Sequence, residues 1–351
     1  MSKLQTPSIV AIAGSESAFN NLTERIAADN NLESALLEMT VKQRTHVDTA
    51  RVREQIYTSD IKRPIYEMHQ IPKRNSEGLR CIYYTKSNEE MLLQLAICQV
   101  LSPIFDSSFM DSSYAFRPCR GPKLAVARMK ELLESGEVWA VNFDIRNCFG
   151  EIPHQELISS IQQKVADSRL IELLSAIIKT GYYDRTVGIR VFPQKGILQG
   201  MILSPLLCNI YLDQFDSEWE SQYSKIGTLI RYADDFVILT RSHDKALYAA
   251  NAASQLLGSL SMSSKKKPAP ANLREKSIDF LGFTHTVNVE QARQLPSVTA
   301  VNRITSRISQ PISRRKLKKL RHSWLNYYGI NDESTNIINT LVDMRLRLST
   351  Q

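Results

Sequence analysis

No stretch of this sequence approaches the roughly 18 consecutive apolar residues that a membrane-spanning helix needs. The N-terminus has one lysine before a short apolar stretch, PSIVAIAG, which is too weak for a secretion signal. The chain has only five cysteines, and they show neither metal-binding nor redox spacing. We therefore expect a cytoplasmic protein with reduced thiols and no membrane partner.

Acidic residues are absent from one long segment, 291–331, which holds nine arginines and lysines. The rest of the chain has 35 basic and 36 acidic residues, so the net charge of +8 comes from this segment. A basic region on a near-neutral body favours a polyanionic partner, although a solvated helix face would give the same pattern. Aromatic residues follow at once, and aromatics beside arginines suit base stacking and phosphate contacts. The nucleic-acid-binding candidates here are Arg314, Arg315, Lys318, Lys319, Arg321, Trp324 and Tyr327.

The spacing of apolar residues predicts an alternation of helices and strands. The expected helices cover 1–60, 87–105 with Ser87 as its N-cap, 121–134, 153–166, 204–222, 244–259 and much of 297–351. The expected strands cover 138–145, 186–192 and 278–287, with hairpins at 63–85 and 229–240. This order predicts an α+β fold in which helices back an antiparallel sheet, close to a split βαβ arrangement.

Two adjacent carboxylates, Asp234 and Asp235, interrupt the apolar stretch LIRYADDFVILT. Burying neighbouring carboxylates is unfavourable, and a solvated Asp-Asp turn is the ordinary explanation for such a pair. A second apolar strand, VWAVNFDI at 138–145, also ends near a carboxylate, Asp144. Two such strands side by side would bring the carboxylates together. A cluster of this kind is tolerable around divalent cations and suits phosphoryl transfer.

The motifs around these carboxylates resemble those of reverse transcriptases, in particular the bacterial group II intron type. YADD at 232–235 is similar to the catalytic hairpin, and FDIRNCF at 143–149 is similar to the other catalytic strand. Further similar blocks follow the family order: IPKRNSEGLRCI (71–82), SSYAFRPCRGPKLAV (112–126), GILQGMILSPLLCNIYLDQFD (196–216), FLGF (280–283) and WLNYYGI (324–330). The chain departs from the family pattern by lacking an N-terminal G-x-DG stretch and by having Met201 where a glycine is usual.

The resemblance implies a right-hand polymerase fold and RNA-directed DNA synthesis from a primer 3′ end. The expected divisions are an N-terminal helical extension (1–59), fingers (60–135), a palm with an antiparallel sheet (136–288) and a helical thumb with maturase-like features (289–351). The expected partners are an RNA template, a DNA or RNA primer and dNTPs. The expected cofactor is a pair of Mg²⁺ ions, with Mn²⁺ able to substitute.

The resemblance also assigns roles to individual residues. Asp144, Asp234 and Asp235 would be catalytic and would bind the metals with the backbone of Ile145. The nucleotide-binding residues would be Lys73, Arg80, Phe149, Gln199, Gly200 and Lys266, although Lys265 and Lys267 compete with Lys266 for its role beside pyrophosphate. Phe149 would exclude a 2′-hydroxyl and so select dNTPs. Arg117 would either hold the template backbone or pack structurally.

Several alternatives stay open at the level of sequence. Synthesis could start from a protein or from a dedicated RNA, and a maturase-like RNA-binding scaffold would share the fold. The three carboxylates argue against the scaffold. Because no endonuclease, DNA-binding or RNase H domain fits after residue 351, we expect a stand-alone, domesticated relative. Antiviral defence, with a dedicated non-coding RNA or an operon-encoded partner, is one such setting.

Overall fold

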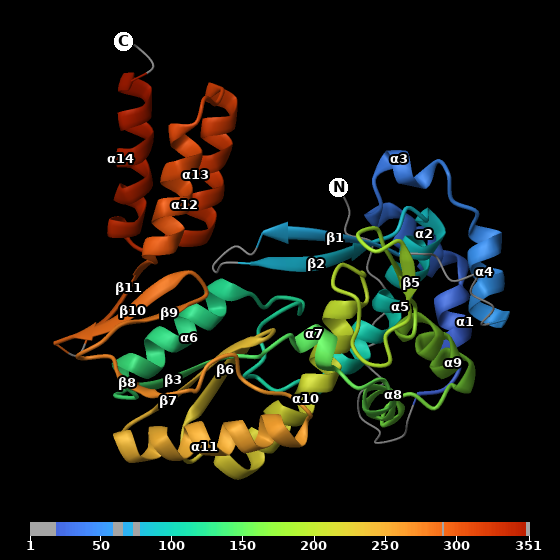
Figure 1. Cartoon of the computed structure of the whole chain (residues 1–351), viewed down its shortest axis with the longest axis horizontal. Helices are drawn as coiled ribbons and strands as arrows, with labels where there is room; N and C mark the ends of the chain where they lie inside the picture. Colours follow the sequence, from blue (N-terminus) through green and yellow to red (C-terminus); the bar gives the residue numbers. More distant parts are fainter. Residues whose placement is uncertain (1–18, 59–65, 73–77, 290, 349–351) are drawn as a thin grey trace. The chain divides into compact units, whose positions relative to one another are not determined.

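A computed structural model describes residues 19–58, 66–72, 78–289 and 291–348. Figure 1 shows the elements of the chain, which forms two compact units. Unit 1 comprises residues 1–119, 145–218 and 256–263, and unit 2 comprises residues 120–144, 219–255 and 264–351. Two long helices, α10 (Ser204–Tyr223) and α11 (His243–Ser259), contribute residues to both units. Among the described residues, no helix has the length and apolarity to cross a membrane.

Unit 1 is largely helical and carries a four-stranded sheet in the order β2-β1-β4-β5. β1 pairs antiparallel with β2 and parallel with β4, and helices α1, α2 and α4 pack on α5. Its strands are β1 (Tyr66–Pro72), β2 (Leu79–Tyr84), β4 (Tyr182–Asp184) and β5 (Ile189–Val191). Its helices are α1 (Leu22–Ala27), α2 (Asp29–Glu38), α3 (Val41–Arg44), α4 (Thr49–Thr58), α5 (Asn88–Asp106), α7 (Cys148–Glu151), α8 (His154–Gln162) and α9 (Ser168–Ile178).

Helix α5 is the buried centre of unit 1, and its start was predictable. The backbone N–H of Glu90 donates to the Ser87 hydroxyl at 3.1 Å, so Ser87 is the N-cap as predicted. One face of the helix is fully buried, including Leu92, Leu93 and Ile97. A helix with this much buried surface can anchor the smaller helices around it.

Unit 2 contains an antiparallel sheet in the order β6-β7-β3-β8 and a smaller sheet in the order β11-β10-β9. The first has β3 (Trp139–Asp144), β6 (Thr228–Tyr232), β7 (Asp235–Thr240) and β8 (Pro270–Asn272). The second has β9 (Ile278–Phe280), β10 (Phe283–Asn288) and β11 (Gln291–Pro296). The remaining helices are α6 (Pro122–Glu134), α12 (Val298–Ser309), α13 (Arg314–Tyr328) and α14 (Asp332–Leu348).

The segment 278–287 is the clearest error of the sequence prediction. The chain reverses at Leu281 and Gly282, whose φ angles are 51° and 79°, so one expected strand becomes the antiparallel pair β9 and β10. Glycine adopts this left-handed conformation without strain, and Gly282 also leaves room for the Tyr328 hydroxyl, which would lie 2.7 Å from an added Cβ. Sequence periodicity also missed α9, β4, β8 and β11, and the strand expected at 186–192 begins only at Ile189.

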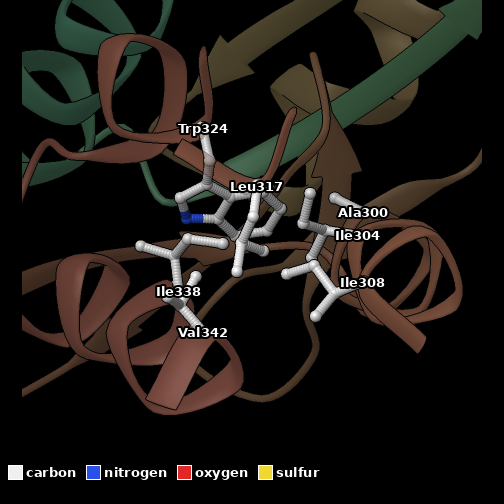
Figure 2. Close-up of a cluster of buried hydrophobic side chains, with 7 residues drawn as sticks. All are labelled: Ala300, Ile304, Ile308, Leu317, Trp324, Ile338 and Val342. Carbon is white, nitrogen blue, oxygen red and sulfur yellow. The ribbon is translucent and has the colours of Figure 1, made fainter. Parts of the chain in front are cut away.

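The helices α12, α13 and α14 share a hydrophobic core, shown in Figure 2. Side chains from all three helices converge there, and packing of these faces stabilises helices that would be marginal alone. The members are Ala300, Ile304, Ile308, Leu317, Trp324, Ile338 and Val342.

A buried polar network joins the smaller sheet of unit 2 to α6. His285 donates from Nε2 to the Phe280 carbonyl at 3.2 Å, and its Nδ1 accepts from Gln294 Nε2 at 3.2 Å. Gln294 Nε2 also donates to the Val126 carbonyl at 2.8 Å. Since Nδ1 accepts a hydrogen bond, the imidazole is neutral. Burial lowers the pKa of His285 to about 4, against the smaller opposing effects of the Phe280 carbonyl and Asp279.

We predict that His285 makes the chain less stable in mild acid. The unfolded chain binds a proton near pH 6.5, whereas folded His285 does so only near its pKa of about 4. Stability is therefore complete above pH 6.5 and falls as the pH drops towards 4. Between pH 7.5 and pH 5, urea unfolding should show wild type losing about 2 kcal/mol more than His285→Gln. Equal losses in the two proteins would contradict this assignment.

Candidate active site

Asp144 and Asp235 face each other across two antiparallel strands of unit 2. β3 and β7 pair in register from Trp139 opposite Thr240 to Asp144 opposite Asp235. The neighbouring pair, Phe143 and Phe236, stacks on the other face with ring centroids 4.5 Å apart and an interplanar angle of 10°. A slip by one residue would turn the buried rings to the carboxylate face, so the phenylalanine pair fixes the register.

The turn between β6 and β7 consists of only two residues, Ala233 and Asp234. Ala233 has a φ of 57°, a left-handed conformation that non-glycine residues rarely adopt. The fully buried Arg231 supports the turn, since its Nη1 donates to the Ala233 carbonyl at 3.2 Å. The tight turn thereby holds Asp234 directly beside Asp235, and strained backbone of this kind is typical of functional sites.

The three carboxylates influence one another electrostatically. Burial, followed by the nearby charges of Asp234 and Asp144, raises the pKa of Asp235 to about 8, and the Lys265 ammonium opposes the rise. Such a shift means that the site disfavours a further negative charge. A group that supplies positive charge here would restore the ionised form of Asp235.

Lys265 already provides one such charge. Its Nζ lies 2.5 Å from Asp144 Oδ1, and its backbone N–H donates to the Asp144 carbonyl at 2.8 Å. The sequence prediction placed Lys266 in the nucleotide site, whereas the lysine at the carboxylates is its neighbour Lys265. Spacing alone could not choose among three consecutive lysines.

The oxygen-rich chemistry of this site fits a hard divalent cation. Asp144 is half-exposed and already accepts a cation in the form of Lys265. The negative charges of Asp234 and Asp144 raise the pKa of Asp235, and a bound cation would lower it again. Within the described ranges, no group of three or more His, Cys, Asp or Glu side chains is arranged so that it could hold a metal ion. The fit therefore rests on the carboxylate pair and on the adjoining Asp234.

Other residues predicted to bind the nucleotide lie in unit 1. The backbone N–H of Tyr83 in β2 donates to the Gln199 carbonyl at 2.7 Å. Gly200, with a φ of 114°, packs so closely that an added Cβ would lie 2.3 Å from the Tyr83 carbonyl oxygen. The Gln199–Gly200 loop is thus fixed to the strand that carries the exposed Arg80. Lys73 lies outside the described residues.

Phe149 lies in the short helix α7, which follows Asp144 and Ile145 closely in the sequence. The Phe149 carbonyl accepts from the Ile197 N–H at 2.8 Å, which ties α7 to the segment leading into Gln199. The ring is only partly buried, whereas Ile145 is fully buried. The partly exposed Phe149 is therefore linked through Ile197 to the segment that contains Gln199.

Arg117 is held by internal contacts, which favours the structural one of its two predicted roles. Its side chain is 6% exposed and its Nε lies 2.6 Å from Asp106 Oδ1. The remaining guanidinium N–H groups donate to the carbonyls of Asp106, Met110 and Ser113. A guanidinium with this many internal partners has little left for a phosphate.

Two aromatic predictions on α13 also change. Trp324 belongs to the bundle core of Figure 2, and its indole N–H donates to the Ser334 carbonyl at 3.3 Å, so it is not a base-stacking platform. The Tyr327 hydroxyl donates to the Leu281 carbonyl at 2.9 Å. Burial raises the pKa of Tyr327, and the neighbouring Tyr328, followed by Tyr232 and Asp235, adds to the rise. The sequence showed that aromatic residues occur in this helix, but it did not show which of them are buried and which are exposed.

The basic residues of α13 remain available to a polyanion. The side chains of Leu317 and Trp324 are buried, whereas the predicted cationic side chains are exposed. Among them, Arg321 Nε donates to Asn339 Oδ1 at 3.0 Å. The exposed members are Arg314, Arg315, Lys318, Lys319 and Arg321.

Comparison with known proteins identifies the family to which this fold belongs. Residues 71–285 match the family model described as "Reverse transcriptase (RNA-dependent DNA polymerase)". This is more than half of the chain, so the protein belongs to the reverse transcriptase family. Apo telomerase from Candida tropicalis has a similar fold, with a TM-score of 0.55 and 15% identity over 83% of this chain and 59% of that one. The predicted α+β right-hand fold is thereby confirmed.

Curated relatives confirm the resemblance to the group II intron type. Group II intron-encoded protein LtrA from Lactococcus lactis subsp. cremoris is 35% identical over 153 residues, which is 44% of this chain and 25% of LtrA. Protein YkfC from Escherichia coli K12 is 31% identical over 159 residues, 41% of each protein. The chain thus spans less than half of the length of either relative.

We predict that Gly200→Ala destabilises the chain by at least about 2 kcal/mol, because both its φ and the Tyr83 carbonyl exclude a Cβ. Urea unfolding would measure the change. Gly258→Ala in α11 is the matched control, since nothing lies within 4 Å of its added Cβ and alanine favours helix. A Gly200→Ala protein as stable as the Gly258→Ala protein would contradict the close approach.

Proposed function

We propose that the chain is an RNA-directed DNA polymerase that adds dNTPs to a primer 3′ end. The register that sets Asp144 opposite Asp235, with Asp234 in the adjoining turn, carries this proposal. Carboxylates in this arrangement are poorly explained as a solvated turn, because burial and mutual repulsion act on Asp235. The family match supports the same reaction class.

Asp144, Asp234 and Asp235, with the Ile145 carbonyl, would hold two Mg²⁺ ions, which Mn²⁺ can replace. When bound, such ions lower the pKa of the primer 3′-hydroxyl and neutralise the leaving pyrophosphate. The protein's part is to keep its oxygen ligands in register through the β3–β7 pair. Lys265, whose Nζ lies at Asp144, replaces Lys266 as our candidate for the group that donates a proton to the leaving pyrophosphate.

Arg80 and Lys73 would clamp the triphosphate, because a guanidinium binds phosphate with two parallel bonds and an ammonium acts as a point charge. Gln199 would contact the nucleotide near its sugar, with Gly200 allowing close approach of the backbone. Phe149 would occupy the space of a 2′-hydroxyl. These residues fall in the proposed fingers (60–135) and palm (136–288).

The exposed basic face of α13, in the proposed thumb (289–351), would hold the template–primer duplex through its phosphates. Tyr327 would act beside it by supporting the Leu281 turn near the catalytic hairpin. We propose an RNA template and a DNA or RNA primer. The basic, acid-free face supports a backbone contact without sequence preference.

The biological setting is a further part of the proposal. We favour a cytoplasmic enzyme, for which antiviral defence, a dedicated RNA or an operon-encoded partner are candidate settings. The maturase-like scaffold is disfavoured by the three carboxylates. Sequencing the nucleic acid that copurifies with the protein would identify a dedicated RNA.

Primer extension on an RNA template with a DNA primer, Mg²⁺ and dNTPs should require the carboxylates. We expect Asp144→Asn or Asp234→Asn to lower the rate by about a thousandfold or more, since each removes a negative charge that would hold the metal ions.

Asp244→Asn is the control for that measurement, because its carboxylate is fully exposed on α11. It should extend primers at the wild-type rate. If the folded wild-type protein extends no primer in any lane, a conventional template–primer reaction is wrong, and priming by a protein or a dedicated RNA is favoured.

Phe149→Val should reduce discrimination against NTPs by 10- to 100-fold, because the smaller side chain leaves room for a 2′-hydroxyl. The ratio of kcat/KM for dNTP to that for NTP measures this change. Phe192→Val, at an exposed phenylalanine, should leave the ratio unchanged. A Phe149→Val enzyme with wild-type discrimination would assign sugar selection to another residue.

A further inference from the structure

Unit 1 contains a buried polar network that joins β1, α5 and the loop before α10. The Tyr66 hydroxyl donates to Glu90 Oε1 at 3.1 Å. Gln94 Nε2 donates both to the same Glu90 oxygen and to the Tyr66 hydroxyl oxygen, each at 2.5 Å. Gln94 Oε1 in turn accepts the backbone N–H of Leu203 at 3.2 Å. The three side chains are at most 4% exposed.

The donors of this network are fully matched to acceptors. Both N–H groups of the Gln94 amide and the Tyr66 hydroxyl proton are used, and the Gln94 oxygen faces the Leu203 N–H. Burial raises the pKa of Glu90, against the hydrogen bonds from Gln94 and Tyr66. Glu90 Oε1 accepts hydrogen bonds from both Tyr66 and Gln94.

The backbone that this network holds is the loop containing Gln199 and Gly200. One side of the loop is bonded to β2 through Tyr83 N–H and the Gln199 carbonyl. At the other end of the loop, the Leu203 N–H donates to Gln94 Oε1. The hydroxyl of the next residue, Ser204, donates to the Leu198 carbonyl at 2.8 Å. The loop is thus held from β2, from α5 and from the start of α10.

We propose that Gln94 is a positioning residue, which through the Tyr66–Glu90–Gln94 network sets the Gln199–Gly200 loop for binding the incoming nucleotide. This inference rests on the proposed polymerase function. Stability alone is a weak reason for such a network, since replacing buried hydrogen-bonded groups by apolar ones of similar shape is often neutral. The particular contribution of Gln94 is the hydrogen bond that its Oε1 accepts from the Leu203 N–H, which an apolar side chain cannot make.

Gln94→Met tests the proposal, because methionine fills a similar volume and removes all the amide hydrogen bonds. Amide hydrogen exchange of the peptide covering 198–204 should show the Leu203 N–H exchanging about tenfold faster or more. In primer extension, KM for dNTP should rise about tenfold, whereas KM for the template–primer should stay within about twofold.

A second variant controls this experiment. Gln99→Met makes the same substitution farther along α5, where the side-chain amide donates to the Ser34 hydroxyl and to Glu38, and should change neither readout.

Unchanged Leu203 exchange in Gln94→Met, or an equal rise in both KM values, would overturn the positioning role. A wild-type protein that extends no primer would overturn the proposed function instead, and the exchange measurement would still decide whether Gln94 holds the loop.

Discussion

The repulsion between Asp144 and Asp235 is the constraint on which unit 2 depends. Antiparallel register brings these carboxylates to one face of the sheet, where their negative charges repel each other. The stacked rings of Phe143 and Phe236 hold the register from the opposite face, while Arg231 holds the two-residue turn that adds Asp234. Hydrophobic burial of the two rings thus stabilises an arrangement of carboxylates that electrostatics disfavours.

In unit 1 the main constraint is the position of the backbone in the Gln199–Gly200 loop. The Gln199–Gly200 loop is secured by close approach to Tyr83 and by the side chain of Gln94, so hydrogen bonds rather than charge set its position. The basic face of α13 adds a third kind of chemistry, since exposed cations attract phosphates without fixing a geometry. A template-directed polymerase needs all three: concentrated negative charge, an ordered nucleotide loop and a diffuse positive surface.

Local patterns predicted much of this fold. Ser87 before Glu90 marked the start of α5, Ser204–Pro205 marked the start of α10, and the apolar runs around Asp144 and Asp235 marked the strands of the site. Errors arose where a single residue outweighed periodicity, as at Gly282, which splits one expected strand into two. They also arose where other helices set the environment of a side chain, as for Trp324.

The sequence by itself determined the kinds of element, the three carboxylates and the family, because these are written in short-range spacing and in ordered motifs. Only the tertiary structure decided that Lys265 rather than Lys266 reaches Asp144, that Trp324 fills a helical core, and that Glu90 and Gln94 support a loop more than 100 residues away. The physical reason is that burial and hydrogen-bond partners depend on contacts between segments far apart in the chain. Residue spacing constrains such contacts only weakly.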